Sequence, residues 1–418
     1  MLFAAAGILS LNHMLIYTPD SARYLAWANS LAQFRGYIDL TVPEPARYVV
    51  HAPLYPALLV PAAWIAPTSI LAAKIATLLF GTLTLAVFFL WMKTNVEWRL
   101  ALGAAIALSL NSFMLIYSTQ VLSEVPFFLC IVIAFWLTQD VIEKANRPPM
   151  VGWREIGLVA AVVAAIFLRE VGLTLVMAML VVLVLHKRYR TAGILFGISV
   201  LFSMAWFVRN EIVIATAEQP AMRNTHLFFS HLYTANNASL VQEFLARLST
   251  NAAIYSEAAL RLLFLPEFGL RSYMLVRPQE GMLSIALSIL SIMRYPIIVC
   301  SVGGMMYGAW CARKRPATAK ILLVFTSVYV VPILLYPIND NRFLFPLLSV
   351  FLAVVSFAIE DLLARFKFGE GKNKIRFALA TVLGLLVVFP NAAWSVSFVE
   401  NGWRYHHHPV EYISDIQC

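Results

Sequence analysis

The 418-residue sequence is short of charge. Lys, Arg, Asp and Glu make up only 13% of it, whereas hydrophobic residues make up 61%. Because soluble proteins carry roughly 25% charged residues, this scarcity excludes an ordinary soluble domain and indicates a polytopic membrane protein. Acidic residues are the scarcer sign, 22 against 31 basic ones, which gives a net charge of +9. Basic cytoplasmic loops explain such an excess in a membrane protein, so we expect no nucleic-acid partner.

Cysteine is also scarce, and the four cysteines are scattered along the chain. No two have the spacing of a metal site, and they form no disulfide framework. The first apolar segment, 2–17, lacks a basic flank and a clear small-residue cleavage site before Asp20. We therefore interpret it as an uncleaved spanning helix rather than a signal peptide.

Long apolar runs are what the sequence has in abundance. Eleven are long enough to cross a bilayer, and they predict an all-α polytopic membrane protein with about 11 transmembrane helices in a single domain, 1–418. The runs lie at 2–17 and at about 70–92, 100–117, 120–138, 155–168, 171–186, 191–208, 285–311, 318–336, 343–360 and 376–398.

The basic residues predict the orientation of these spans. Seventeen of the 31 fall in alternate short loops, and the loops rich in Lys and Arg are the cytoplasmic ones. The N-terminus is then cytoplasmic, and two long connections, 18–69 and 209–284, lie outside with the tail, 399–418. For a compact chain of this kind we expect the inner membrane of a bacterium, with the outer connections in the periplasm.

Each long outer connection contains one amphipathic stretch. Tyr24, Trp27, Leu31 and Phe34 repeat at helical spacing in the first, and a stripe that includes Val241, Phe244, Leu245 and Leu248 does so in the second, with Glu243 and Arg247 opposite. Both patterns predict helices that lie in the membrane interface.

Ionisable residues gather at the outer ends of the predicted spans. Charged groups at membrane depth are costly, and are therefore candidates for function. Because several separate helix ends present carboxylates and cations to one plane, we expect one pocket there. Its candidate residues are Asp20, Arg23, His51, Glu124, Arg169, Glu170, Arg209, Asp340 and Arg342.

The motifs around these residues resemble those of a known superfamily. In order they read Asp-x-x-Arg-Tyr from Asp20, His-x-Pro-Leu-Tyr-Pro from His51, Ser-Glu-x-Pro, a short Arg-Glu hairpin, Trp-x-x-Arg-Asn and Arg-Phe-Leu-x-Pro. This order is similar to that of the GT-C superfamily, and most of all to bacterial relatives of the protein mannosyltransferases and to the lipid A aminoarabinose transferases. These are integral-membrane glycosyltransferases that use polyprenyl-phosphate-linked sugars.

The resemblance implies transfer of a sugar from a polyprenyl-phosphate donor to a hydroxyl of a lipid, glycan or protein acceptor in the cell envelope. Asp20 then serves as the general base that takes the hydroxyl proton. The leaving phosphate needs charge stabilisation, which arginine supplies well. We assign this task to Arg23, Arg169, Arg209 and Arg342 with His51, and a role at the acceptor or as second carboxylate to Glu124, Glu170 and Asp340.

Other interpretations stay open for these residues. Asp20 could cap the helix that follows it, Glu124 could pair with an arginine, and Arg169 and Arg342 could anchor helices to lipid headgroups. Such a reaction requires no cofactor, although a divalent cation held by Asp20 and Glu124, as in the oligosaccharyltransferase branch, is an alternative. A transporter or lipid flippase of envelope glycan precursors would have as many spans, but it would carry ionisable groups at mid-membrane, where most of these spans have none. A non-catalytic envelope assembly factor is the remaining alternative.

Overall fold

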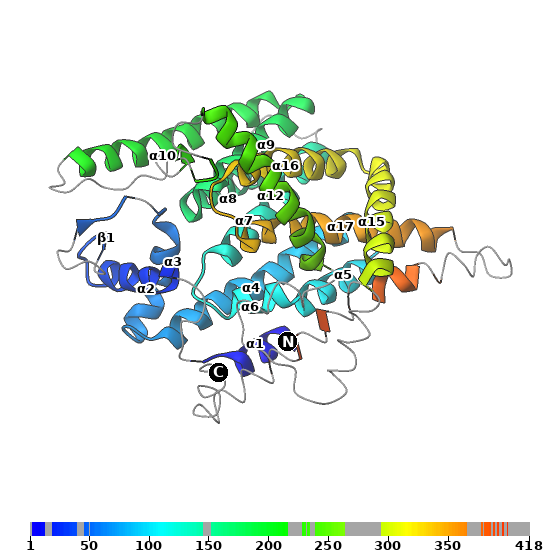
Figure 1. Ribbon diagram of the computed structural model, residues 1–418, viewed down its shortest axis with the longest axis horizontal. Coiled ribbons are helices and arrows are strands. Elements are labelled where there is room, and N and C mark those ends of the chain that lie inside the picture. Colours follow the sequence, from blue (N-terminus) through cyan, green and yellow to red (C-terminus); the bar gives the residue numbers. More distant parts are fainter. Residues whose placement is uncertain are drawn as a thin grey trace.

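The computed structural model is a bundle of helices with a small unit, built from residues 19–39, 46–49 and 51–65, at one side (Figure 1). It describes residues 2–12, 19–39, 46–49, 51–144, 152–215, 228–230, 232–234, 239–263 and 294–365, together with 378, 380–385, 388, 391–392, 395–396 and 399. The described elements are α1 (Leu2–Ser10), α2 (Pro19–Ala32), β1 (Ile38–Asp39), β2 (Ala46–Arg47), α3 (Leu54–Ile65), α4 (Ile70–Lys93), α5 (Trp98–Leu110), α6 (Ser112–Ser118), α7 (Glu124–Glu143), α8 (Trp153–Leu168), η1 (Glu170–Gly172), α9 (Leu173–Leu185), α10 (Tyr189–Ala215), α12 (Leu240–Leu263), α15 (Arg294–Cys311), η2 (Ala312–Lys314), α16 (Pro316–Leu335), η3 (Asn341–Leu347) and α17 (Leu348–Ala364).

The all-α polytopic class is confirmed, apart from the two-residue antiparallel pair β1–β2. Five helical segments of the described chain are long and apolar enough to cross a membrane: α4, α7, α10, α16 and the continuous unit Asn341–Ala364. The pair α5–α6 would be a sixth span if its two helices, bent by 61°, are counted together. The expected number of about 11 spans is not confirmed, because Glu170–Leu185 is a shorter apolar helix and parts of 2–17, 285–311 and 376–398 lie outside the described residues.

The central helix α7 holds the bundle together. Its phenylalanine side chains are buried and meet rings of three other elements. The ring centroid of Phe135 lies 5.5 Å from that of Trp91 of α4 and 5.0 Å from that of Phe325 of α16, and the centroid of Phe128 lies 4.9 Å from that of Phe345 of η3. Such buried aromatic contacts fix the neighbouring helices by area and by ring geometry. The loop ends that follow these helices are thereby fixed relative to one another.

Helix breaks place the charged residues at one end of the bundle. Between α8 and α9 the chain turns at Arg169, which is extended (φ −152°, ψ 138°). A side chain on Gly172 would lie 2.4 Å from the carbonyl oxygen of Ala165, so only glycine permits so tight a return. This hairpin holds Arg169 and Glu170 at the same end as the start of α7 and the η3 turn.

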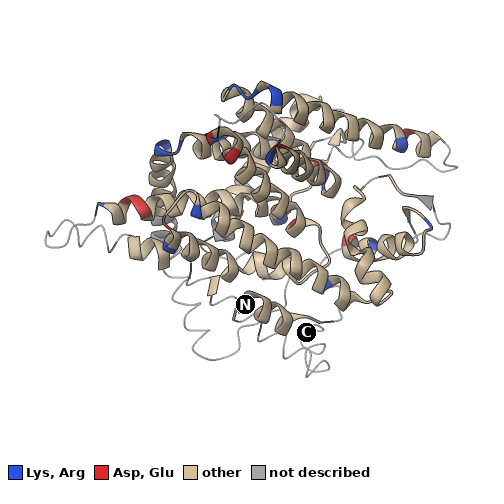
Figure 2. Ribbon diagram, turned by 180° about the vertical axis from the view of Figure 1, so that it is seen from behind, with Lys and Arg blue, Asp and Glu red and all other residues tan. Residues whose placement is uncertain are grey.

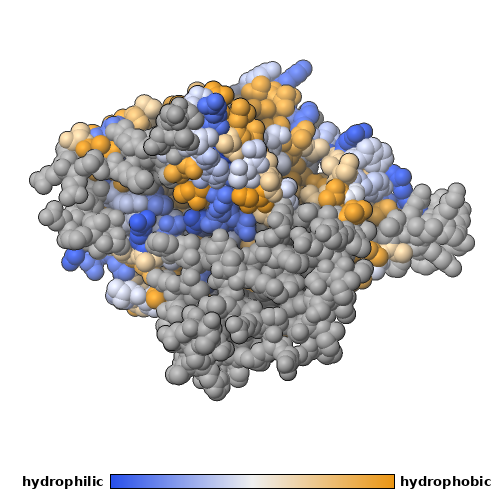
Figure 3. Space-filling view, in the orientation of Figure 1, coloured by the Kyte–Doolittle hydropathy of each residue, from blue (hydrophilic) through white to orange (hydrophobic). Residues whose placement is uncertain are grey.

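Most of the amphipathic stripe of α2 packs against protein. Tyr24, Trp27 and Ala28 are buried against the α3 side of the unit, whereas Phe34 is 88% exposed. The place of α2 at the membrane interface stays a prediction, to which the structure adds that α3 covers most of the stripe. Apolar patches lie among hydrophilic residues on the face shown in Figure 3, and the exposed apolar side chains of the protein include Phe196, Leu201 and Met204 of α10, as expected of a lipid-facing helix.

Candidate functional site

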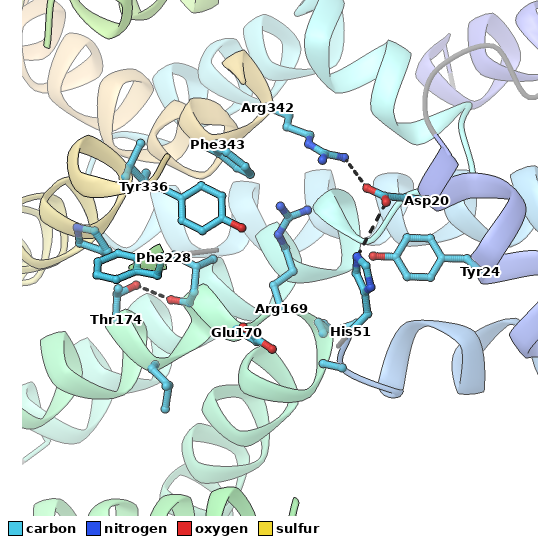
Figure 4. Close-up of a pocket in the computed structure, with 16 residues that line it drawn as sticks. Asp20, Tyr24, His51, Arg169, Glu170, Thr174, Phe228, Tyr336, Arg342 and Phe343 are labelled. Carbon is cyan, nitrogen blue, oxygen red and sulfur yellow. Dashed lines mark hydrogen bonds and ion pairs between the residues drawn. The ribbon is translucent and has the colours of Figure 1, made fainter. Parts of the chain in front are cut away.

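A pocket of about 390 Å³ opens where α2, the turn before α3, the α8–α9 hairpin and the α16–η3 connection meet. One part of its wall is charged or polar, formed by Asp20, Tyr24, His51, Arg169, Glu170 and Arg342. The other part is largely apolar, with Leu168, Val171, Leu173, Phe228, Pro332, Ile333 and Phe343 among its residues. Figure 4 shows Arg169, Arg342 and Tyr336 directed into the space between these walls.

Arg342 is the most connected charge in this pocket. Its Nη1 lies 2.9 Å from Oδ2 of Asp20 and 3.6 Å from Oε1 of Glu124, and its Nε lies 3.0 Å from Oδ2 of Asp340. Asp340 also caps η3, since its carboxylate accepts a hydrogen bond from the backbone N–H of Arg342. Asp20 and Arg342, 322 positions apart in the sequence, are thus joined by a hydrogen bond from the guanidinium to the carboxylate.

Arg169 forms the second cationic point of the cluster. Its Nη1 lies 2.5 Å from Oε1 of Glu124, and it donates a hydrogen bond of 3.4 Å to Oγ of Ser123. The same Ser123 hydroxyl is hydrogen-bonded to the hydroxyl of Tyr24, 3.2 Å away. Burial raises the pKa of Tyr24 to about 12, so its hydroxyl keeps its proton at neutral pH.

The environment shifts the pKa values of Asp20 and Asp340, the two aspartates paired with Arg342, in opposite directions. Burial alone would raise the pKa of Asp20, but the charge and hydrogen bond of Arg342, with His51 and Arg169, outweigh it and hold that pKa below 3.8. For Asp340 burial prevails over Arg342, and its pKa is raised above that value. Asp20 is therefore fully ionised at neutral pH.

His51 lies beside Asp20 within a group of aromatic rings. Its Nε2 is 3.7 Å from Oδ1 of Asp20, and its Nδ1 is 2.6 Å from the Tyr48 hydroxyl. The rings of Trp27 and Tyr48 lie 5.5 and 5.6 Å from the imidazole. Burial lowers the pKa of His51, and Asp20 offsets this only in part, so the imidazole is neutral at pH 7.

The structure brings most of the predicted site residues together, but not Arg209. That residue lies over the Trp206 ring at 4.8 Å, donates to the backbone oxygen of Tyr48, and lines a second cavity with Arg35. Arg23 is half-buried on α2 and does not line the main pocket, although its charge lowers the pKa of His51. The rotation of α10 about its axis sets the direction in which Arg209 points. The position of Arg209 at a helix end does not predict this direction.

Glu124 and Glu170 occupy different positions relative to the pocket. Glu170 lines it and is exposed, whereas Glu124 is only 2% exposed and lies behind the two arginines. Within the described chain no three His, Cys, Asp or Glu side chains are grouped as metal ligands.

Several lining residues were not among the predicted ones. Tyr24, Thr174, Phe228 and Tyr336 all line the pocket. Tyr24 follows Asp20 by one helical turn, which is a signal that the sequence contains. Tyr336, by contrast, resembles an ordinary interfacial aromatic residue. Phe228 lies in a part of the long connection 209–284 that shows no hydrophobic periodicity.

Fold and pocket define a polytopic helical membrane protein with a charged cavity at one end of its bundle. No protein-family model and no curated protein matches the sequence. Solved structures do resemble the fold, and the resemblance to the GT-C superfamily is confirmed at that level.

ArnT from Cupriavidus metallidurans in the apo state matches with a TM-score of 0.57 and 12% identity, over 96% of this chain and 75% of that one. The same protein bound to undecaprenyl phosphate matches with a TM-score of 0.56 and 13% identity, over 96% of this chain and 74% of that one. The archaeal oligosaccharyltransferase AglB from Archaeoglobus fulgidus, in complex with an inhibitory peptide and a dolichol-phosphate, matches with a TM-score of 0.56 and 14% identity over 96% of this chain. The present chain spans 55% of the length of AglB.

Proposed function

We propose that this protein is a membrane glycosyltransferase that moves a sugar from a polyprenyl-phosphate donor to a hydroxyl of an envelope lipid, glycan or protein. The observation that carries the proposal is the pocket itself. Two arginines suited to a phosphate face a wall suited to a prenyl chain, and a carboxylate lies beside them. The solved structures of similar fold with bound undecaprenyl phosphate or dolichol-phosphate support this choice of donor.

The phosphate of the donor would lie between Arg169 and Arg342. Arginine binds phosphate through parallel N–H donors, and both guanidiniums are directed into the pocket (Figure 4). Phe228, Ile333 and Phe343 would then contact the first isoprene units of the lipid. His51, 3.7 Å from Asp20, would complete the polar side of this phosphate site.

The reaction is a single displacement. The acceptor oxygen forms a bond to the anomeric carbon while the bond from that carbon to the phosphate oxygen breaks, and the electron pair of that bond remains on the phosphate. Asp20 takes the hydroxyl proton as general base, and Arg169 and Arg342 stabilise the negative charge that develops on the leaving phosphate. A single displacement inverts the anomeric centre.

We propose that no divalent cation takes part. The guanidinium of Arg342 lies 2.9 and 3.6 Å from the two carboxylates, Asp20 and Glu124, that such a cation would bridge. Because the arginines supply the positive charge at the phosphate, transfer should persist in an excess of chelator. Loss of transfer in chelator that added Mg²⁺ or Mn²⁺ restores would contradict this part of the proposal.

Replacement of Asp20 by Asn tests the proposed base. The purified protein would be given undecaprenyl-phosphate hexoses and pentoses with envelope lipid, glycan and peptide acceptors, and release of undecaprenyl phosphate would be measured. General-base catalysis contributes about 10²- to 10⁴-fold, so Asp20→Asn should reduce the rate by that order. Glu97→Gln, at an exposed carboxylate of the opposite end, is the control and should retain the wild-type rate.

Two results would contradict the proposal. An undiminished rate in Asp20→Asn would remove Asp20 from the role of base. Movement of lipid-linked sugar across sealed vesicles by the wild type, without any glycosyl transfer, would instead favour a flippase.

A further inference from the structure

Glu124 holds a position that the proposed reaction does not use. It is the first residue of α7, it is 2% exposed, and it is absent from the pocket lining. A buried carboxylate is costly unless cations compensate its charge. Here two cations do so, since Oε1 lies 2.5 Å from Nη1 of Arg169 and 3.6 Å from Nη1 of Arg342.

One carboxylate oxygen therefore lies between two guanidiniums that would otherwise repel each other. Neither carboxylate oxygen of Glu124 has an aligned hydrogen-bond donor within the described chain, so charge and proximity, more than directed bonds, hold the contact. The position at the start of α7 favours a negative side chain as well, because the positive end of the helix dipole lies there.

The other carboxylates around Arg342 differ in their access to a ligand. The side chains of Asp20 and Asp340 are 18% and 15% exposed, so an entering phosphate can take their place on Arg342. Glu124 lies behind the arginines, where a phosphate in the pocket cannot displace it. Its contacts with both arginines can thus persist while the donor is bound.

We propose that Glu124 is a positioning residue, a fixed counter-ion that holds the guanidiniums of Arg169 and Arg342 together on the donor phosphate. This inference rests on the proposed function. It predicts that removal of the charge alters the orientation of the arginines more than their attraction for phosphate. The attraction should in fact increase, because the net positive charge of the site rises.

Glu124→Gln tests this with a readout that does not depend on transfer. Binding of farnesyl phosphate to the detergent-purified protein gives a Kd, and transfer assays with the active donor give kcat. We expect a Kd equal to or lower than that of the wild type, together with a kcat reduced by about tenfold or more. Glu124→Asp, which retains the charge, should recover part of the lost kcat, and it serves as the folded variant if Gln prevents folding.

A double-mutant cycle separates positioning from a general loss of structure. If Glu124 acts through Arg169, then Glu124→Gln should change kcat far less in an Arg169→Gln background than in the wild type. Weaker binding of farnesyl phosphate in Glu124→Gln, an unchanged kcat, or additive effects in the cycle would each overturn the proposal. Failure of the wild type to bind farnesyl phosphate and to transfer sugar would instead reject the proposed function.

Discussion

At the scale of single residues, the pair of Asp20 and His51 gives the proposed reaction a defined dependence on pH. Arg342 holds the pKa of Asp20 below its ordinary value of 3.8, so this carboxylate stays ionised between pH 5 and 6.5 in the free protein. The pKa of His51 is lowered from 6.5, first by burial. Below that lowered pKa a second cation would face Asp20 and weaken it as a base.

We therefore predict that the wild-type rate falls as pH drops through the lowered pKa of His51, below 6.5, and that this acidic limb is absent in His51→Gln. Stability should follow the same sign, because a histidine with a folded-state pKa below its unfolded value loses its contribution as pH falls through 6.5. Rate and thermal stability measured from pH 5 to 8 would check both. An acidic limb that persists unchanged in His51→Gln would contradict the assignment.

The sequence predicted Asp20, His51, Arg169 and Arg342 for a physical reason. Charges at membrane depth are so costly that few remain, and those at one end of a bundle converge. Which of these side chains come into contact depends on the rotation of each helix about its own axis. A single charged residue in the sequence does not reveal that rotation. Arg209 was misplaced for this reason, since it lies at the correct depth but faces the Trp206 side of α10.

At the scale of elements, α12 has its polar side turned toward protein. Glu243, Arg247 and Asn251 are fully buried, whereas Val241, Leu245 and Leu248 are 66%, 59% and 40% exposed. The exposed apolar stripe agrees with the predicted place of α12 at the membrane interface. The burial of its charged side could not be predicted, because the partners are backbone groups of distant segments.

These buried charged side chains bind α12 to the backbone of segments that lie at the pocket. Arg247 donates to the backbone oxygens of Phe228, Ser230 and Leu335 and is paired with Glu243, 2.7 Å away. Burial would raise the pKa of Glu243, but hydrogen bonds from Thr234, Arg247 and backbone N–H groups lower it to about 2. Phe228 is thus positioned at the pocket by a helix of the long connection 209–284.

We predict that Arg247→Met loosens the Phe228 segment. The change keeps an apolar side chain of similar length, but it leaves Glu243 buried without its cation and three carbonyl oxygens without a donor, which is strongly destabilising. The melting temperature should fall by several degrees, and protease cleavage near Phe228 should accelerate. Arg35→Met, at an exposed arginine three residues after the end of α2, is the control. Unchanged cleavage in Arg247→Met would contradict the fastening role.

At the scale of the whole molecule, the predicted cytoplasmic loops meet at one end. Arg315 donates to the backbone oxygen of Asn95 and pairs with Glu360, which also accepts from the N–H of Glu97. The side chain of Asn95 donates to Gln139 at 2.9 Å. Figure 2 shows the charged positions mostly at helix ends, with long uncharged stretches between them. Along the chain, the segments that carry the pocket charges Asp20, Arg169 and Arg342 alternate with these basic loops. The two groups of segments gather at different ends of the bundle.

This alternation leads to a prediction about which end faces the outside of the cell. Basic residues favour the cytoplasmic side, and the end that holds Asn95, Arg315 and Glu360 contains most of the basic loops. The opposite end, with Asp20 and Arg342, should then face the periplasm. Phe34 is 88% exposed near the pocket end, and the Glu97 side chain is 63% exposed at the other.

Cysteine labelling in whole cells decides the orientation. With the four native cysteines replaced, Phe34→Cys and Glu170→Cys should react with a membrane-impermeant maleimide in intact cells. Glu97→Cys should react only after the inner membrane is permeabilised. The reverse pattern would place the pocket in the cytoplasm and exclude a periplasmic acceptor, and labelling of all three from one side would contradict the two-ended arrangement itself. Because the label reads the side of the membrane directly, this result does not depend on whether sugar transfer is observed.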